Sequence, residues 1–359
     1  MDRTKVNSAP KSLSLHIKFI WATVSIVIFV VVVELALRLA EINLYYKNQF
    51  FPVNRDIDFP EVYEKDTELF WRFRKGFVTQ SKMFSYLNYR INAHGVRGPE
   101  IIELKQGYRI IALGNSCTFG WGVYYADTWV YRLQETLKRE LRRGDIEVIN
   151  AGVPGYSSHQ GKIYFSEELL SLSPDMVLVM FGWNDHWKAG RGISDARQRM
   201  PHWLIIEVQN LFSKLKLYQL LRKIVLSSTE KERLVALDDM SGERRVSGQE
   251  FYDNLKSIVR LARENKIQPI LLVPPIASLE NYPQVPRTNL HHLHQQYQRQ
   301  IIRVAQLEQV PIVNLQEAFD RYCDLYDAPG EDFIHFNIKG HAVVAEAIAN
   351  QVVPLLRQQ

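Results

Sequence analysis

Three short motifs that lie far apart in the chain carry the side chains that a serine-dependent acyl transfer needs. Ser116 follows an apolar run in the motif Gly-Asn-Ser, and Asn184 follows another apolar run in Gly-Trp-Asn-Asp. Asp332 and His335 belong to the motif Asp-Phe-Ile-His near the C-terminus. Together these motifs supply a hydroxyl nucleophile, an amide donor and a carboxylate–imidazole pair. Each motif alone is common in turns and helix caps, so the interpretation depends on their joint placement at the ends of predicted strands.

The predicted roles follow from the chemistry of each group. His335 would accept the Ser116 proton and return it to the leaving group, while Asp332 would fix the imidazole tautomer. Ser116, at the first turn of a helix, would direct its own backbone N–H at a developing oxyanion. The Asn184 amide is predicted to donate to the same oxyanion. Gly155 lies in a glycine turn after another strand and leaves room for a further backbone N–H.

Cysteine and histidine usage argues against other chemistries. Two cysteines exclude a disulfide framework and a four-cysteine zinc site. Cys117 follows Ser116 directly, so a thiol nucleophile is an alternative, but we expect this small side chain to pack beneath the turn. The three histidines at 291, 292 and 294 fall on a predicted helix without the i, i+4 pairing of a zinc site, and we expect them at the surface. No metal and no other cofactor is therefore expected.

From residue 108 onward the sequence alternates between short apolar runs and helical periodicity. The expected strands are 109–113, 147–149, 176–181, 269–273 and 311–313, and the expected helices are 129–141, 159–170, 249–265, 290–307 and 341–356. Continuous apolar strands that alternate with helices predict an α/β fold with a parallel sheet covered on both faces. A ligand then binds at the carboxyl ends of the strands, where the candidate motifs lie.

This ordered set of motifs resembles the SGNH/GDSL hydrolase family, whose four sequence blocks contain Ser, Gly, Asn and His. The matching residues here are Ser116, Gly155, Asn184 and His335 with Asp332. The resemblance covers residues 108–357. It implies a three-layer, flavodoxin-like α/β/α sandwich around a five-stranded parallel sheet, with Ser116, His335 and Asp332 as the triad. It also implies oxyanion donors at the Ser116 N–H, the Gly155 N–H and the Asn184 side chain.

The chain departs from the family pattern at one position in the first block. Asn115 stands where the family usually has Asp before the serine. Asparagine keeps the shape of aspartate and loses its charge. Because the family's Asp is not the triad acid, we expect activity to survive.

The N-terminal region predicts a membrane anchor. Residues 19–33 are uncharged and mostly apolar, and residues 35–39 extend the run past Glu34. A spanning helix needs about 20 residues, so Glu34 must lie near the far interface, where Arg38 can pair with it. A cleaved signal peptide is the alternative, but the small residues that a peptidase requires are poorly placed. Basic residues precede the span and only Asp2 opposes them, which places the N-terminus in the cytoplasm.

The expected organisation is therefore that of a single-pass membrane protein with an extracytoplasmic (periplasmic or extracellular) catalytic domain. Residues 1–18 form a cytoplasmic tail, 19–40 the transmembrane anchor, and 41–107 a connecting segment or small β appendage. Residues 108–357 form the catalytic domain, with an insertion at 186–248. Within the insertion, residues 203–226 predict one amphipathic, basic helix that packs on the core, forms a lid or lies on the membrane surface. The insertion ends in a mostly polar or charged stretch, 230–247.

Three functions are compatible with these features. The leading hypothesis is an ester hydrolase (esterase or acylhydrolase) acting on an ester or acylated-glycan substrate. An O-acyltransferase acting on an extracytoplasmic glycan, for example in O-acetyl transfer, would use the same triad. A non-catalytic binding protein on the same fold is supported only by Asn115. The net charge of +5 comes without any recognisable nucleic-acid-binding module.

Overall fold

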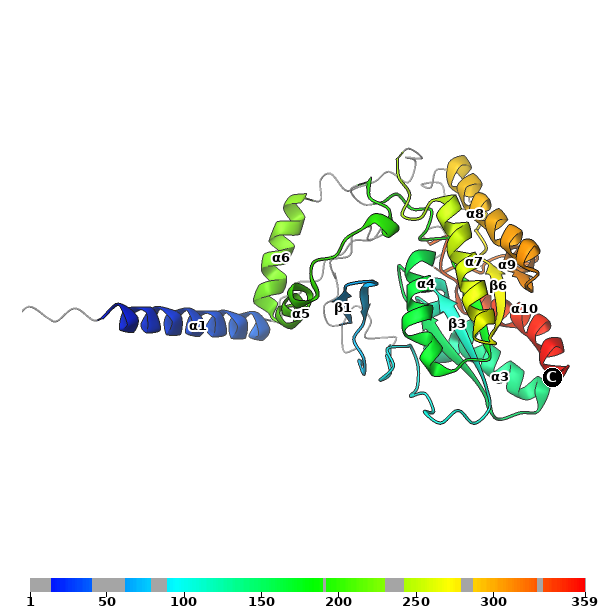
Figure 1. Cartoon of the computed structure of the whole chain (residues 1–359), viewed down its shortest axis with the longest axis horizontal. Helices are drawn as coiled ribbons and strands as arrows, with labels where there is room; N and C mark the ends of the chain where they lie inside the picture. The colour runs from blue at the N-terminus through cyan, green and yellow to red at the C-terminus, as the bar shows by residue number, and fades with distance from the viewer. Residues whose placement is uncertain are drawn as a thin grey trace, which may run out of the picture. The chain divides into compact units, whose positions relative to one another are not determined.

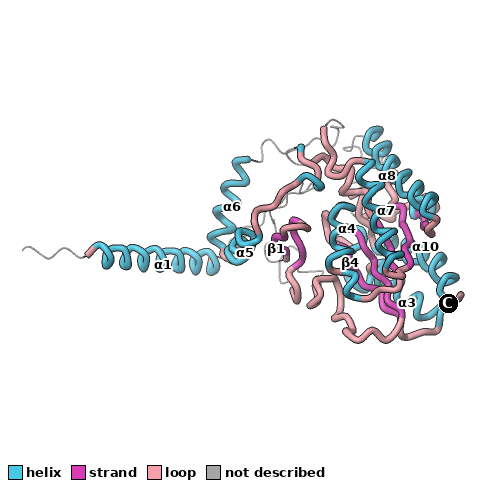
Figure 2. The backbone as a smooth tube through the Cα atoms, viewed as in Figure 1, coloured by secondary structure: helices cyan, strands magenta, loops and turns pink. Residues whose placement is uncertain are grey.

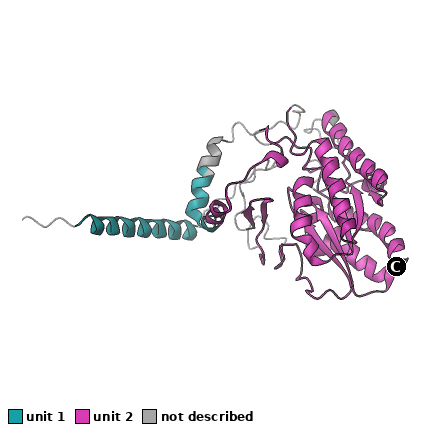
Figure 3. Cartoon of the chain, in the orientation of Figure 1, with its two compact units in different colours: residues 1–46, 211–233 teal, residues 47–210, 234–359 magenta. Residues whose placement is uncertain are grey.

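The computed structural model of the protein describes residues 14–40, 62–78, 89–189, 192–229, 242–278, 287–327 and 332–358. The chain forms two compact units (Figure 3). The smaller unit comprises residues 1–46 and 211–233, and the larger comprises residues 47–210 and 234–359.

The larger unit is built on a five-stranded parallel sheet with the strand order β4-β3-β5-β6-β7. The strands are β3 (Tyr108–Gly114), β4 (Ile146–Gly152), β5 (Met176–Met180), β6 (Gln268–Val273) and β7 (Ile312–Asn314). All five predicted strands are present, and the predicted parallel α/β sheet is confirmed. Helices flank the sheet in Figures 1 and 2.

Side chains alternate between the two faces of the sheet, and each face has its own apolar core. On β3, Ile111 and Leu113 pack in one core, while Ile110 and Ala112 pack in the other. The first core is covered by α4 (Ser158–Glu167), α7 (Gly248–Glu264) and α8 (Arg287–Glu308), and the second by α3 (Trp129–Leu141) and α10 (Ile338–Arg357). This period-two alternation gives the three-layer arrangement.

Short elements connect these layers, and the sequence patterns did not predict most of them. They are α2 (Ser116–Phe119), α9 (Leu315–Phe319) and the 3₁₀ turns Tyr125–Asp127, Leu169–Leu172 and Asp195–Arg197. Before the sheet, β1 (Tyr63–Asp66) and β2 (Phe70–Phe73) form an antiparallel ribbon. The buried aromatic side chains of this ribbon belong to the same apolar core as α4 and α7. Much of the expected connecting segment, residues 41–61 and 79–88, lies outside the described residues.

The smaller unit contains α1 (Leu15–Leu39), a 25-residue helix that is long and apolar enough to cross a bilayer. The predicted ion pair is present, since Arg38 lies 2.6 Å from Glu34. The prediction of one helix over residues 203–226 is wrong, because three residues separate α5 (Trp203–Phe212) from α6 (Lys216–Thr229). The Glu34 carboxylate accepts the N–H groups of Lys216 and Leu217, so α6 starts where that distant side chain caps it.

Candidate active site

Ser116 is the first residue of α2 and lies two residues after Gly114, the last residue of β3. The short helix is capped by Asn115, whose side-chain oxygen accepts the Cys117 N–H at 3.0 Å. An N-cap needs only an acceptor oxygen, which an amide supplies as well as a carboxylate does. Asn115 therefore preserves the turn that presents Ser116, even though the family usually has Asp there.

The structure brings Ser116, His335 and Asp332 together, although 219 residues separate the serine from the histidine. His335 Nε2 lies 2.8 Å from Ser116 Oγ, and His335 Nδ1 lies 2.6 Å from Asp332 Oδ2. The carboxylate is an acceptor, so the shared proton belongs on Nδ1 and leaves Nε2 to accept the serine hydroxyl. This is the proton arrangement that a general base needs before it activates a hydroxyl.

The loop before α10 holds Asp332 in its charged form. Asp332 Oδ1 accepts the backbone N–H groups of Ile334 and His335, both at 2.9 Å. Burial raises the pKa of the Asp332 carboxyl, but the facing imidazole and these hydrogen bonds outweigh burial and lower the pKa below its ordinary value. The carboxylate thus stays ionised and can stabilise a positive charge on His335.

Hydrogen bonds also connect the turns that follow β3, β4 and β5. The Val153 N–H donates to Gly114 O at 3.0 Å, and the Asn184 side-chain amide donates to Tyr156 O at 2.9 Å. Gly155 lies between these contacts with φ +85°, a backbone conformation that favours glycine. The Asn184 amide has two N–H donors, so the bond to Tyr156 uses one and leaves the other for a second acceptor.

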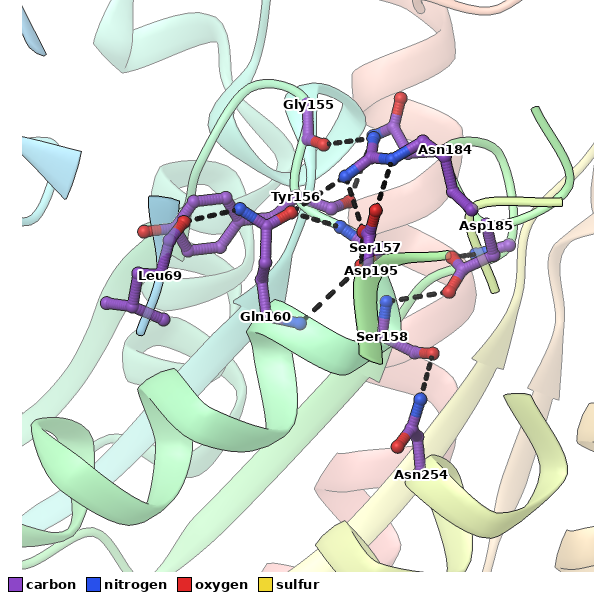
Figure 4. A network of polar contacts seen from close by, with 12 residues as sticks. Leu69, Gly155, Tyr156, Ser157, Ser158, Gln160, Asn184, Asp185, Asp195 and Asn254 are labelled. Atoms are coloured by element: carbon purple, nitrogen blue, oxygen red, sulfur yellow. Dashed lines mark hydrogen bonds and ion pairs between the residues drawn. The ribbon is translucent and has the colours of Figure 1, made fainter. Parts of the chain in front are cut away.

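A buried polar network that the sequence did not reveal surrounds the Gly155 turn (Figure 4). Arg245 donates to Gly155 O at 2.8 Å and pairs with Asp195 at 2.7 Å. The two side chains are only 6% and 5% exposed. Asp195 also accepts the Ser157 hydroxyl at 2.7 Å, and Gln160 accepts a further Arg245 N–H at 2.9 Å. The insertion thus supplies an ion pair that holds the turn after β4.

Replacing Arg245 by methionine is expected to lower the free energy of unfolding by about 3–5 kcal/mol, because Asp195 then stays buried without its partner. Urea unfolding of the variant measures this loss. The matched control is Arg260→Met, which removes an exposed partner of Glu264 and should change stability little. Adding Asp195→Asn to the Arg245 variant should recover part of the loss, and a double variant less stable than the single one would contradict this account.

The structure agrees with the expectation for Cys117 and contradicts the one for His294. Cys117 is 2% exposed and lies beneath the turn with Sγ 3.5 Å from Ile334 O, and burial raises the pKa of its thiol. The predicted surface position is wrong for His294, which is fully buried with Nδ1 3.1 Å from His186 Nε2. Its helix, α8, turns this face toward the core, where the ring stacks on Trp183 with centroids 4.1 Å apart.

Trp121 is another residue near the site that sequence patterns did not identify. Its ring lies beside the His335 imidazole, with centroids 6.0 Å apart. It follows the short helix α2, and no periodicity singles it out from the other aromatic residues.

Several known proteins are similar to this chain in structure or in sequence. The chain is similar in structure to a lipase/acylhydrolase from Enterococcus faecalis, with 19% identity, a TM-score of 0.45, and coverage of 69% of this chain and 96% of that one. A catalytic mutant of an acetylxylan esterase from Geobacillus stearothermophilus is also similar in structure, with 18% identity and a TM-score of 0.45. The match covers 70% of this chain and 96% of that one. An uncharacterized lipoprotein, YqeF, of Bacillus subtilis (strain 168) is 28% identical over 81 residues. That match covers 22% of this chain and 33% of the lipoprotein.

The comparison with family models identifies the chain more directly. The matching model covers residues 112–343, which is more than half of the chain and includes every candidate site residue. The protein therefore belongs to the GDSL-like lipase/acylhydrolase family.

Proposed function

We propose that this protein is a serine-dependent acyl-ester hydrolase in which Ser116 is the nucleophile, His335 the general base and Asp332 the acid of the triad. The observation that carries the proposal is the continuous contact from Ser116 Oγ to His335 Nε2 at 2.8 Å and from His335 Nδ1 to Asp332 Oδ2 at 2.6 Å. A serine hydroxyl is a weak nucleophile unless an adjacent base takes its proton, and this contact supplies such a base.

The reaction proceeds in two halves. Ser116 Oγ attacks the ester carbonyl carbon while His335 takes the hydroxyl proton, and Asp332 stabilises the resulting imidazolium. Collapse of the tetrahedral intermediate breaks the ester C–O bond, and His335 gives its proton to the departing alcohol. A water molecule then attacks the acyl-enzyme with His335 again as the base, which releases the acid and restores Ser116.

We further propose that three N–H groups stabilise the oxyanion of the tetrahedral intermediate. They come from the Ser116 backbone, the Gly155 backbone and the second N–H of the Asn184 amide. Support comes from the fixed positions of these groups, because the first N–H groups of a helix lack intrahelical acceptors and the Asn184 amide is held by Tyr156 O. Donors that are already oriented stabilise developing charge without further reorganisation.

Removing the Asn184 amide by substitution with alanine is expected to lower kcat by about 10²–10³-fold, the usual effect of losing one oxyanion donor. The measurement is kcat for p-nitrophenyl acetate, with thermal unfolding to confirm that the variant is folded. The matched control is Asn254→Ala, which removes another buried amide, one that donates to Ser158 Oγ at 3.1 Å. An Asn184 variant that turns over no more slowly than the Asn254 control would exclude the oxyanion role.

The full-length protein in detergent can test the proposed reaction directly. It is treated with a fluorophosphonate, and mass spectrometry locates the modified residue. We expect covalent labelling of Ser116 together with hydrolysis of p-nitrophenyl acetate. Hydrolysis that gives way to acyl transfer when a glycan acceptor is added would identify an O-acyltransferase instead. A folded protein that is not labelled would contradict the proposal.

We also propose that α1 is an uncleaved membrane anchor and that the catalytic residues lie on the extracytoplasmic side. The length and apolar character of α1 support a span, and the basic residues before it support a cytoplasmic N-terminus. An extracytoplasmic, membrane-associated location also agrees with the name of the Bacillus relative, which is a lipoprotein.

A further inference from the structure

The smaller unit contains a polar contact between the end of α1 and the start of α6. Glu34 is 9% exposed, and its two carboxylate oxygens accept the N–H groups of Lys216 at 3.0 Å and Leu217 at 2.9 Å. Arg38 pairs with the same carboxylate at 2.6 Å and donates to Lys214 O at 3.1 Å. Glu34 thus satisfies two N–H groups in the first turn of α6, which have no intrahelical partners, and Arg38 binds the backbone just before the helix.

This contact exists only in a chain that retains α1. Removal of α1 would take away the carboxylate that caps α6 and the guanidinium that accompanies it. The contact also sets the depth of α6. Glu34 lies 16 residues after Lys18, which is about 24 Å along a helix, and the hydrocarbon core of a bilayer is about 30 Å thick. If Lys18 lies at one interface, the first turn of α6 lies near the other.

The segment that begins at residue 211 has the composition of a helix that binds a lipid surface. Leu217, Leu221 and Ile224 recur at i, i+4 and i+7 on one face of α6, and the last two are 56% and 58% exposed. Leu211 and Phe212, just before it, are 65% and 46% exposed. Residues 211–229 contain four basic side chains and no acidic one. Such a segment is complementary to an anionic bilayer surface.

The direction of α6 relative to α1 agrees with a position on the bilayer surface. In Figure 1, α6 runs across the end of α1 instead of alongside it. If α1 crosses the bilayer, α6 therefore extends along the plane of the interface.

We propose that residues 211–229 lie on the bilayer surface on the far side of the α1 span, with Leu221 and Ile224 in the outer acyl region and the basic side chains at anionic headgroups. This proposal rests on the proposed membrane span, not on the hydrolase activity. The protein is then attached to the membrane by two elements that are far apart in sequence, and Glu34 joins them. This part of the insertion in the catalytic domain thus contacts the membrane.

The test uses the full-length protein in nanodiscs that contain anionic phosphatidylglycerol. Cys323→Ser removes the exposed native thiol, and Cys117 is buried. A single cysteine is then introduced as Leu221→Cys and labelled with an environment-sensitive fluorophore. Lipids that carry a shallow doxyl group are expected to quench this label strongly. The matched control is Gln219→Cys, on the opposite side of the same helix, which should be quenched less by lipid and more by aqueous iodide.

Three further results decide the proposal. Val27→Cys, in the middle of α1, should be quenched by a deep doxyl group, and failure there would overturn the span and the proposal together. Glu34→Ala should reduce lipid quenching at position 221, because α6 loses its cap and its tether. Equal quenching at positions 219 and 221, or quenching by iodide alone at 221, would overturn the bilayer contact. Hydrolysis of p-nitrophenyl acetate, measured on the same samples, reports separately on the proposed reaction.

Discussion

Replacing Ser116 by alanine is expected to lower kcat for p-nitrophenyl acetate by about 10⁶-fold, the size of the loss when a triad nucleophile is removed. The proposed triad would act as a unit, so His335→Ala should cost about as much, and the double variant should be no slower than either single variant. These variants should still accelerate the reaction about 10³–10⁴-fold over the uncatalysed reaction in water, because the proposed oxyanion donors and substrate binding do not depend on the serine oxygen. The measurement is kcat for the four proteins under the same conditions.

The control for this prediction is another serine in the same unit. Ser166 lies on α4, is half-buried, and donates its hydroxyl to Ile163 O at 2.9 Å, so Ser166→Ala should leave kcat unchanged. A Ser116→Ala protein that keeps a tenth or more of the activity would mean that another group is the nucleophile. The adjacent thiol is a poor substitute, since Cys117 is buried and burial raises its pKa.

The strands of the sheet could be predicted because the pattern of each strand is contained in a short stretch of sequence. Most strands of the parallel sheet are buried on both faces and are therefore nearly continuous apolar runs, as Met176–Met180 is. The motifs after β3 and β5 could be placed at the same edge because parallel strands bring their carboxyl ends together. Helix ends were also close to their predicted positions where a local cap exists, as with Thr128 before α3.

The features that could not be predicted depend on partners that are distant in sequence. The break between α5 and α6 is set by Glu34, which lies 182 residues before Lys216. Arg245 lies in a polar stretch and becomes buried only because Asp195 and Gly155 O meet it in the fold. His294 is one of three nearby histidines with the same local pattern, and only the packing of α8 decides that it is the buried one. Tertiary contacts of this kind produce no periodic pattern in the amino-acid sequence.

Asp332→Asn is expected to lower kcat by about 10⁴-fold while the loop keeps its conformation. The remaining amide oxygen can still accept the N–H groups of Ile334 and His335, which the carboxylate accepts at 2.9 Å. The amide nitrogen, however, would face His335 Nδ1 as a donor. The imidazole proton would then move to Nε2, where it blocks acceptance of the Ser116 proton. The control is Asp324→Asn, which loses only an exposed ion pair with Lys339 and should keep full activity.

The same variant also has a predicted signature in stability against pH. The pKa of Asp332 is lowered in the folded protein, so the stabilisation by this carboxylate is fully present above the pKa of an unfolded aspartate, about 3.9. It is lost as the pH falls through the lower folded value. The difference in unfolding free energy between wild type and Asp332→Asn should therefore shrink when urea unfolding is repeated at progressively more acidic pH below 3.9. A difference that stays constant down to the acid limit of folding would mean that Asp332 is not held as a carboxylate facing His335. In that case the loss of kcat would have to arise from a change in the loop itself.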